Sequence, residues 1–310
     1  MDTDSIITDR QHYDRIMEAT GHQVAGRLHE ARAIYDELIA ANPDDANALH
    51  QLGILFHQAG NHAMAIELVE KALEKMPDFP LFLNNHGHIC LAANLLDKAE
   101  KSLLKATRLK PDEADPLYGL GECYRRRGEL QRATNVIELV LERVPGHVDA
   151  IVSMAQIHYV DGAQERVIEC CDVALDLDPE HFDARFHKAR ALYALKQYGE
   201  AAAILEGLLE TQPENAACHN NLGNTYMALG RYQDAVLAYA ETVERRPDDA
   251  DLRYNLAVAL AQTADLDSAQ QQFEKVLETV PLHERASKML ESVRAAGTGE
   301  SARGETKKHS

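Results

Sequence analysis

The sequence predicts an all-α solenoid in which one helical hairpin is copied along the chain. The first observation is a proline that recurs every 34 residues, at Pro43, Pro77, Pro111, Pro145, Pro179, Pro213, Pro247 and Pro281. The second is that two further positions in each interval hold almost only small residues. Spacing without insertion or deletion indicates one structural unit repeated end to end. A solenoid of this kind is a single elongated body in which each unit contacts only its neighbours.

We number each repeat so that the periodic proline is position 32, and the eight repeats then cover residues 12–283. Position 8 is Ala19, Gly53, Gly87, Gly121, Ala155, Ala189, Gly223 and Ala257. Position 20 is Ala31, Ala65, Ala99, Ala133, Val167, Ala201, Ala235 and Ala269. These positions predict two helices whose backbones approach closely, because larger side chains would overpack the contact.

The break between the two helices is marked at position 15. It holds Gly26, Gly60, Gly128, Gly162 and Gly230, with Asn94, Lys196 and Ala264 in the other repeats. Glycine and asparagine tolerate the positive φ of a tight turn after a helix. We therefore expect helix A over positions 1–14 and helix B over positions 17–30. The proline ends helix B, and an acid after it, such as Asp78, is expected to cap the next helix.

The ends of the array need separate treatment, because an isolated hairpin buries too little apolar surface to fold alone. Residues 284–296 form one further amphipathic segment, which predicts a C-terminal capping helix. Residues 297–310 have almost no apolar content, so we expect a disordered tail. Residues 1–11 are expected to be a frayed N-terminal lead-in.

Charge excludes several partner classes. The chain carries 32 basic and 50 acidic residues, a net charge of −18. Such a surface repels phosphate backbones and anionic headgroups, so the sequence predicts no nucleic-acid partner. No segment is long and apolar enough for membrane insertion, and the N-terminus has no signal-peptide pattern.

The cysteines point to a reducing compartment. The five cysteines form no CxxC pair, and Cys90, Cys123, Cys171 and Cys218 fall at or beside apolar helix positions. A thiol there packs as a small hydrophobe. The predicted location is the cytoplasm.

The pattern resembles the tetratricopeptide repeat (TPR) family over residues 12–283. The match includes the Leu-Gly pair at Leu52-Gly53, Leu120-Gly121 and Leu222-Gly223, the aromatic residues Phe56, Tyr124 and Tyr226 at position 11, and the terminal proline. His86 and Lys188 replace leucine at position 7, and the position-4 aromatic of the family is absent. The resemblance implies a right-handed superhelical solenoid of eight TPR repeats.

A narrower resemblance covers residues 48–73. They resemble the opening repeats of bacterial proteins related to protein O-linked N-acetylglucosamine transferases, in which a TPR superhelix precedes a glycosyltransferase domain. Those relatives carry asparagine at position 6, which Asn85, Asn221 and Asn255 match, whereas Gln51, Gly119, Ser153 and His187 do not. What this resemblance implies is a substrate-recruiting function.

A peptide-binding groove is predicted on helix A. Positions 2, 5, 9, 12 and 13 share one arc of the helix, and in the TPR family this arc lines the concave groove. Aromatic rings interleaved with amides and guanidinium groups suit an extended peptide. The predicted groove residues are Asn84, His88, Tyr118, Glu122, Arg125, Arg126, Tyr159, Phe186, Arg190, Tyr193, Asn220, Asn224, Tyr254 and Asn255.

Two alternatives stay open for individual residues. Tyr118 and Phe186 fit a groove or packing against the next repeat equally well. Arg125 and Arg126 suit the capture of an acidic or terminal carboxylate, whereas Arg127 fits better a solvated charge at a helix C-terminus. Residues expected for a chaperone-binding clamp are missing, since Asn220 stands where that clamp has lysine.

The sequence predicts no enzyme, no cofactor and no metal site. It contains no P-loop and no HExxH motif, and no spacing indicates a nucleophile beside a base. His50, His57 and His88 lack a carboxylate or thiolate at helical spacing. The predicted function is a non-catalytic adaptor that binds a peptide or protein segment. One alternative is a recruiting subunit of a separately encoded glycosyltransferase or other modifying enzyme, and another is self-association through the superhelix ends.

Overall fold

The computed structural model describes residues 3–306, with side chains described for residues 10–296. Within that range it has 17 α-helices and no strand. The helices are α1 (Thr3–Val24), α2 (Leu28–Ala41), α3 (Ala46–Gln58), α4 (His62–Lys75), α5 (Pro80–Ala92), α6 (Leu96–Leu109), α7 (Ala114–Arg126), α8 (Leu130–Arg143), α9 (Val148–Val160), α10 (Gln164–Leu177), α11 (Phe182–Ala194), α12 (Tyr198–Thr211), α13 (Ala216–Ala228), α14 (Tyr232–Arg245), α15 (Ala250–Gln262), α16 (Leu266–Thr279) and α17 (Glu284–Thr306).

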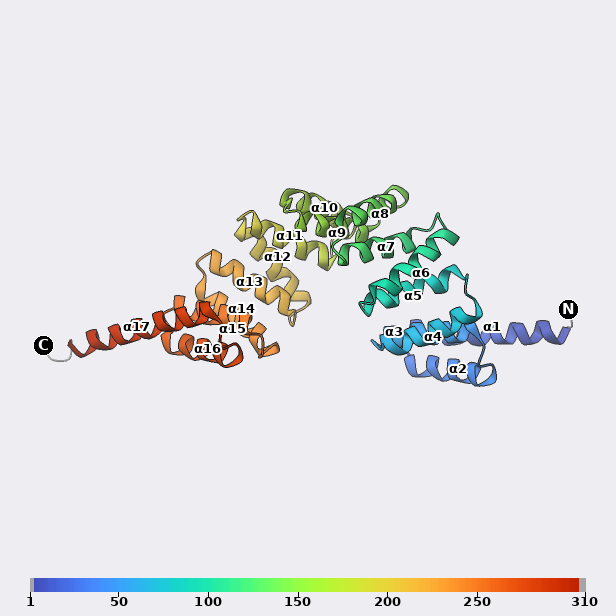
Figure 1. Cartoon of the computed structure of the whole chain (residues 1–310), viewed down its shortest axis with the longest axis horizontal. Helices are drawn as coiled ribbons and strands as arrows, with labels where there is room; N and C mark the ends of the chain where they lie inside the picture. Colours follow the sequence, from blue (N-terminus) through green and yellow to red (C-terminus); the bar gives the residue numbers. More distant parts are fainter. Residues whose placement is uncertain (1–2, 307–310) are drawn as a thin grey trace. The chain divides into compact units, whose positions relative to one another are not determined.

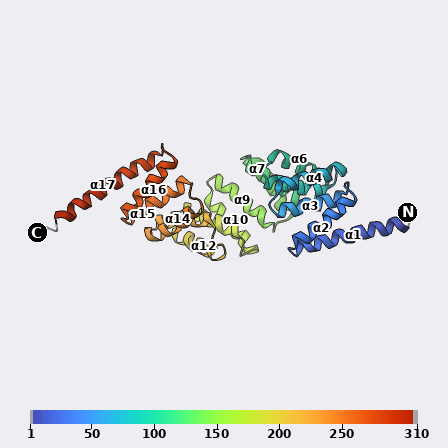
Figure 2. The same ribbon diagram turned by 90° about the horizontal axis from the view of Figure 1, so that it is seen from below.

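The chain divides into two compact units, residues 1–157 and residues 158–310. Unit 1 runs from α1 into α9, and unit 2 runs from the last residues of α9 to α17. Within each unit, consecutive helices lie side by side as hairpins in both views of the ribbon (Figures 1 and 2). The expected all-α repeat architecture is confirmed.

Helix boundaries agree closely with the repeat numbering. In repeat 3, α5 covers positions 1–13 and α6 covers positions 17–30, against expected spans of 1–14 and 17–30. The residue at position 15 has positive φ in every repeat, including 57° at Asn94, 65° at Lys196 and 62° at Ala264. The turn geometry is therefore kept even where glycine is missing.

Small residues at position 8 allow the two helices of a hairpin to touch. A Cβ atom placed on Gly223 would lie 2.6 Å from the Tyr239 ring of α14, and one on Gly53 would lie 2.6 Å from Val69 Cγ2 of α4. Distances this short require the neighbour to move. The side chain of helix B thus fills the space that glycine leaves on helix A.

The helix A caps differ from the expectation by one residue. The cap lies two residues after the periodic proline, where Asp45 accepts hydrogen bonds from the backbone N–H groups of Asn47 and Ala48. Asp249 caps α15 in the same way, through the N–H of Leu252. Asp78 is not the cap of α5, because Phe79 occupies the cap position and Pro80 begins the helix.

Both chain ends are more helical than expected. The predicted lead-in over residues 1–11 belongs largely to α1, which begins at Thr3. The capping helix expected to end at residue 296 continues to Thr306 as α17. The segment from residue 297 to residue 306 contains no proline, so no residue there blocks the helical backbone. Residues 307–310 of the expected tail lie outside the described part.

The hydrophobic core is a series of local clusters. One cluster in unit 1 joins Ala19, Tyr35 and Leu52 to Phe82 across the first three repeats. At the other end, Ala286, Leu290 and Val293 of α17 pack on Phe273 of the last repeat. The first part of α17 therefore covers the end of the array, as expected of a capping helix.

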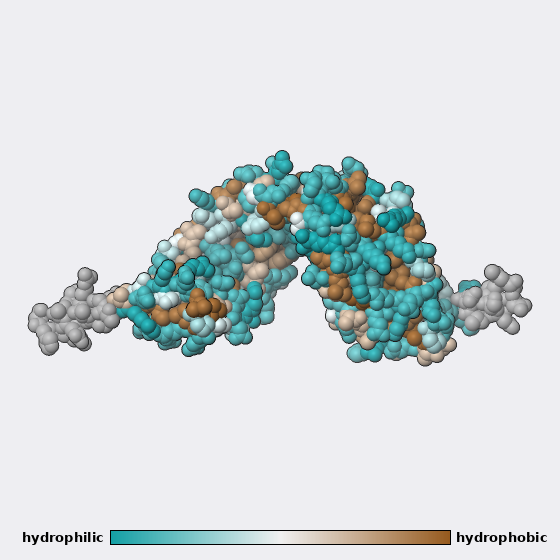
Figure 3. Space-filling view, viewed as in Figure 1, coloured by the Kyte–Doolittle hydropathy of each residue, from teal (hydrophilic) through white to brown (hydrophobic). Residues whose placement is uncertain are grey.

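The surface is largely hydrophilic, with smaller hydrophobic patches over both units (Figure 3). Leu237 of α14 is one of the most exposed apolar side chains, at 68%. No helix among the described residues is long and apolar enough to cross a membrane.

Candidate functional site

Helix A of repeat 4 carries a buried ion pair in unit 1. Arg125 donates from Nε to Glu122 Oε1 at 2.8 Å and from Nη2 to Oε2 at 2.7 Å, which is a bidentate pair. Ser153 of the next repeat donates a further hydrogen bond to Oε1 at 2.7 Å. Both Glu122 and Ser153 are buried. The guanidinium predicted to capture a partner carboxylate therefore already holds one from its own helix.

The same cluster shifts two acid–base equilibria. Burial alone would raise the pKa of Glu122, but hydrogen bonds from Arg125 and Ser153 and the charges of Arg125 and Arg126 lower it overall. Glu122 is thus held ionised. Burial raises the pKa of Tyr118 to about 12, and the nearby Glu122 charge adds to the effect. The Tyr118 ring lies 4.8 Å from the ring of His147, the last residue of the same repeat, which accepts a hydrogen bond from the backbone N–H of Ala150 in α9.

The other two arginines of the run are also engaged. Arg126 donates from Nη1 to the backbone oxygen of Leu91 at 2.7 Å, which links repeat 4 to repeat 3. Arg127 pairs with Glu100 and with Asp97 on α6 of the preceding repeat. Arg127, expected to be a solvated charge, instead forms an ion-pair link between neighbouring repeats.

A second polar group of unit 1 lies on α5. Asn84 is buried and donates to Asp115 Oδ2 of the next repeat at 2.5 Å. Its Oδ1 atom is buried without a hydrogen-bond partner among the described residues. His88 Nε2 lies 3.5 Å from Asp115 Oδ1. The predicted groove residues Asn84 and His88 are therefore brought together, with Asp115 between them.

Among the described residues, His50 is the histidine whose pKa is shifted most strongly. Its ring stacks on Phe82 at a centroid distance of 4.2 Å. The amide nitrogen of Asn85 donates to its Nε2 at 2.9 Å, which engages the lone pair of the neutral ring. Burial lowers the pKa of His50 to about 4. His50 is therefore a neutral packing residue at neutral pH.

Unit 2 presents an arginine of a different kind. The Arg190 guanidinium lies 4.1 Å from the centre of the Tyr159 ring and 5.9 Å from that of Phe186. Within the described residues, no carboxylate forms an ion pair with Arg190. Stacking on rings orients the guanidinium plane while leaving its N–H donors available.

Further predicted residues of unit 2 lie on α11 and α13. Tyr193, 39% exposed, lies one helical turn from Arg190 on α11, and its ring is 5.3 Å from that of Tyr198. On α13, Asn224 Oδ1 accepts a hydrogen bond from the buried Tyr239 hydroxyl at 2.6 Å. That bond orients the Asn224 side chain and uses its oxygen, not its amide N–H groups. Burial raises the pKa of Tyr239, so the hydroxyl stays protonated.

The last predicted residues lie at the end of the array. The Tyr254 ring stacks on His283 at 5.2 Å and has Arg285 of α17 over its face at 4.9 Å. Tyr254 thus packs against the capping helix. On α13, Asn220 Oδ1 is buried without a hydrogen-bond partner in the described chain, as Asn84 Oδ1 is in unit 1. Asn255 is half-buried on α15.

Sequence reasoning missed the pairing of the atypical position-7 residues. His86 Nδ1 lies 2.8 Å from Ser102 Oγ, and its Nε2 lies 3.5 Å from Glu70. Lys188, at the same repeat position, pairs with Asp172 at 2.5 Å. Glu70 and Asp172 both stand at position 25 of the preceding repeat, so this correlated spacing was the available signal.

The cysteines are free and mostly buried. Burial raises the pKa of Cys90 and of Cys171 to about 12, which keeps both thiols protonated and unreactive. No group of three or more histidine, cysteine or acidic side chains among the described residues could hold a metal ion.

Comparison with known families identifies the class. The model of the tetratricopeptide repeat family matches residues 16–79, 85–148 and 220–290, more than half of the chain. The chain therefore belongs to the tetratricopeptide repeat family. A model of anaphase-promoting complex (cyclosome) subunit 3 matches residues 133–208.

Curated relatives are similar over parts of their length. Protein O-mannosyl-transferase TMTC1 of Mus musculus is 29% identical over 126 residues, 39% of this chain and 13% of the relative. The TPR repeat-containing thioredoxin TTL4 of Arabidopsis thaliana is 30% identical over 94 residues, 30% of this chain and 14% of the relative. N-alpha-acetyltransferase 25, the NatB auxiliary subunit of Rattus norvegicus, is 31% identical over 81 residues, 26% of this chain and 8% of the relative. The chain thus spans less than a sixth of these proteins.

Solved structures agree on the fold. The APC/C hetero-tetramer Cut9-Hcn1 superposes with a TM-score of 0.69 and 16% identity, covering 90% of this chain and 55% of the other. PilF of Pseudomonas aeruginosa gives a TM-score of 0.58 and 18% identity, over 68% of this chain and 96% of the other. YrrB, described as a TPR protein with an unusual peptide-binding site, gives a TM-score of 0.53 and 21% identity, over 62% of this chain and 98% of the other.

Proposed function

We propose that this protein is a non-catalytic interaction scaffold that binds an extended peptide or protein segment on the helix A surface of unit 2. We define this surface by Tyr159, Phe186, Arg190, Tyr193, Asn220 and Asn224. It combines aromatic rings, amide groups and one guanidinium on the first helices of three successive repeats, α9, α11 and α13. Amides can pair with a peptide backbone, and rings can cover its side chains.

The observation that carries the proposal is the state of Arg190. Its guanidinium is stacked on Tyr159 and Phe186 but has no acidic partner within residues 10–296. A half-buried arginine without a carboxylate is suited to accept one from a ligand. A segment with an acidic side chain, or a terminal carboxylate, flanked by apolar residues fits this surface.

The arginines of unit 1 have a different role in this proposal. Because Arg125 already holds Glu122 in a bidentate pair, it offers a partner fewer donors than Arg190 does. Arg126 is more exposed, and its contact with the Leu91 backbone leaves other donors available. We therefore rank Arg190 first, Arg126 second and Arg125 third as contacts for a carboxylate.

A crosslinking pull-down from native lysate tests the proposal. The triple variant R125A/R126A/R190A is compared with the unchanged protein, and R190A alone separates unit 2 from unit 1. We expect both variants to lose most of the captured partner. Capture of the same proteins at the same yield by the triple variant would contradict the proposal.

A second candidate function is recruitment of substrate for a separately encoded modifying enzyme, such as a glycosyltransferase. It is favoured by the names of relatives, which include an O-mannosyl-transferase and an auxiliary subunit of an acetyltransferase. In that case a transferase activity should co-purify with the unchanged protein. If the purified complex contained a binding partner but no transferase activity, the result would favour the scaffold function over the recruiting function.

A further inference from the structure

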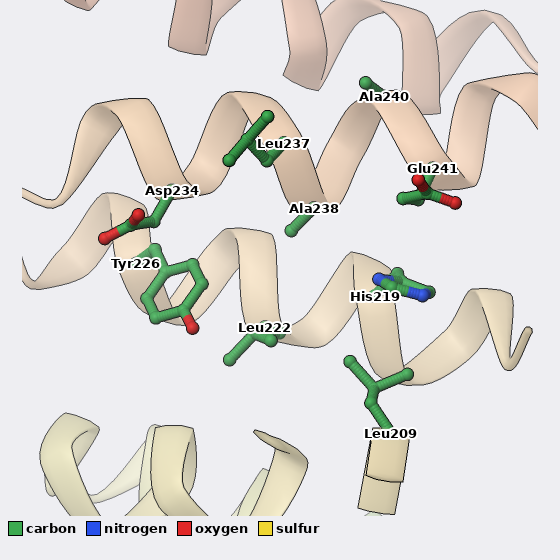
Figure 4. Close-up of a pocket in the computed structure, with 9 residues that line it drawn as sticks. All are labelled: Leu209, His219, Leu222, Tyr226, Asp234, Leu237, Ala238, Ala240 and Glu241. Atoms are coloured by element: carbon green, nitrogen blue, oxygen red, sulfur yellow. The ribbon is translucent and has the colours of Figure 1, made fainter. Parts of the chain in front are cut away.

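Two surface pockets occur at equivalent positions of different repeats. The pocket of repeat 7 has a volume of about 430 Å³ and lies between α13 and α14, beside the end of α12. Figure 4 shows Leu222 and Tyr226 on α13, Leu237 and Asp234 on α14, and Leu209 on α12. The pocket of repeat 3, of about 300 Å³, lies between α5 and α6 beside the end of α4.

The two pockets are lined by residues at matching repeat positions. Leu209 and Leu222 in repeat 7 correspond to Leu73 and His86 in the pocket of repeat 3, where Leu83 adds further apolar surface. Position 4 is Leu83 in repeat 3 and His219, which has less apolar surface, in repeat 7. Neither repeat has a tryptophan, tyrosine or phenylalanine at this position.

The rims of the two pockets have opposite charge. Positions 19, 22 and 26 are Lys98, Lys101 and Lys105 in repeat 3. The same positions are Asp234, Leu237 and Glu241 in repeat 7. Repeat 3 is the only repeat with lysine at all three positions. On a chain with a net charge of −18, this basic rim is a local exception.

The rim charges have only weak internal partners. Lys98 pairs with Glu70 and Lys105 with Asp78, each at 2.8 Å, while Asp234 pairs with Arg231 at 2.7 Å and Glu241 with Arg245 at 2.6 Å. These ions are partly or largely exposed. Surface ion pairs of this kind contribute roughly 0–1 kcal/mol, so exchange for a partner of equal geometry costs little.

We propose that two copies of this chain associate through these pockets, with the basic α6 rim of one copy against the acidic α14 rim of the other. Leu237, 68% exposed, enters the hollow beside Leu73 and Leu83 of the other copy. The methylene stem of Lys101 covers the hollow beside Leu222 in return. The contact uses the hollow between helices A and B and the exposed face of helix B. It includes none of the residues that define the helix A surface of unit 2, so it stands or falls independently of peptide binding.

Charge reversal gives a direct test. Sedimentation velocity over a concentration series measures self-association of the full chain, of K98E/K105E and of D234K/E241K. Each variant alone would place like charges opposite one another, so we expect its association to weaken by roughly a hundredfold or more. Far-UV circular dichroism and the melting temperature verify that each variant is folded.

The mixture of the two variants provides the decisive arm. The unchanged α6 rim of D234K/E241K can meet the unchanged α14 rim of K98E/K105E, so mixed dimers should form with the affinity of the original chain. L237D should be monomeric by itself. The control E138K/E142K makes the same change in net charge as D234K/E241K, on exposed positions of α8, and should associate normally.

Four results would overturn the proposal, and the first three concern the unchanged protein, the single variants and their mixture. They are an unchanged protein that is monomeric throughout the series, single variants that associate as the unchanged protein does, or a mixture that stays monomeric. Association that responds to L237D but to neither charge reversal would also overturn it, because the charge pairing would then have no role.

Discussion

At the scale of single residues, the helix A surfaces divide into side chains that are paired within the chain and side chains that are not. Glu122 and Arg125 satisfy each other in a buried bidentate pair, whereas Arg190 rests on rings without an acid. The difference follows from position 9 and position 12 of the same helix. Repeat 4 has an acid and a base there, and repeat 6 has Arg190 and Tyr193.

His50 makes stability depend on pH. Its pKa falls from 6.5 to about 4 on folding, so between these values the unfolded chain binds a proton that the folded chain does not. Stability is therefore complete above about pH 6.5 and decreases as pH falls towards 4, by about 3 kcal/mol in total for this group. In urea unfolding, the difference in free energy of unfolding between the unchanged protein and H50Q should change by about 3 kcal/mol between about pH 6.5 and pH 4. A constant difference would contradict the assignment.

At the scale of elements, the repeat numbering predicts the helices well, and it does so for a physical reason. A 34-residue period fixes where the backbone turns, so the spans of α5 and α6 follow from the positions of glycine and proline. Side-chain partners do not follow in this way. Ser153 reaches Glu122 from 31 residues away, and Asn85 reaches His50 from 35 residues away. These pairs depend on which residue the neighbouring repeat happens to carry.

The turn between helices A and B offers a stability test at the same scale. Ala264 has φ of 62°, where an L side chain costs about 1–2 kcal/mol and glycine costs little. A264G should therefore raise the free energy of unfolding by about 1 kcal/mol. The matched control is G128A, at the same repeat position with φ of 75°, which should lower it by a similar amount. Equal effects of the two variants in chemical denaturation would contradict the turn geometry.

At the scale of the whole molecule, the chain is a tetratricopeptide repeat array whose two units each have their own local clusters of core residues. Sequence predicts the array, its repeat count and the face of helix A on which polar and aromatic residues collect. It does not predict that unit 1 spends several of these side chains on links between its own repeats. Asn84 and Arg126 show this, through Asp115 and the Leu91 backbone respectively.

The proposed recognition of a protein segment by unit 2 depends on Arg190. The most direct measurement is the dissociation constant of the segment identified by crosslinking, measured for the unchanged protein, R190A and the control R185A. Arg185 lies on the same helix and pairs with Glu180. We expect R190A to bind the segment at least about tenfold more weakly, while its melting temperature and the affinity of R185A change little. Equal dissociation constants for all three proteins would contradict it.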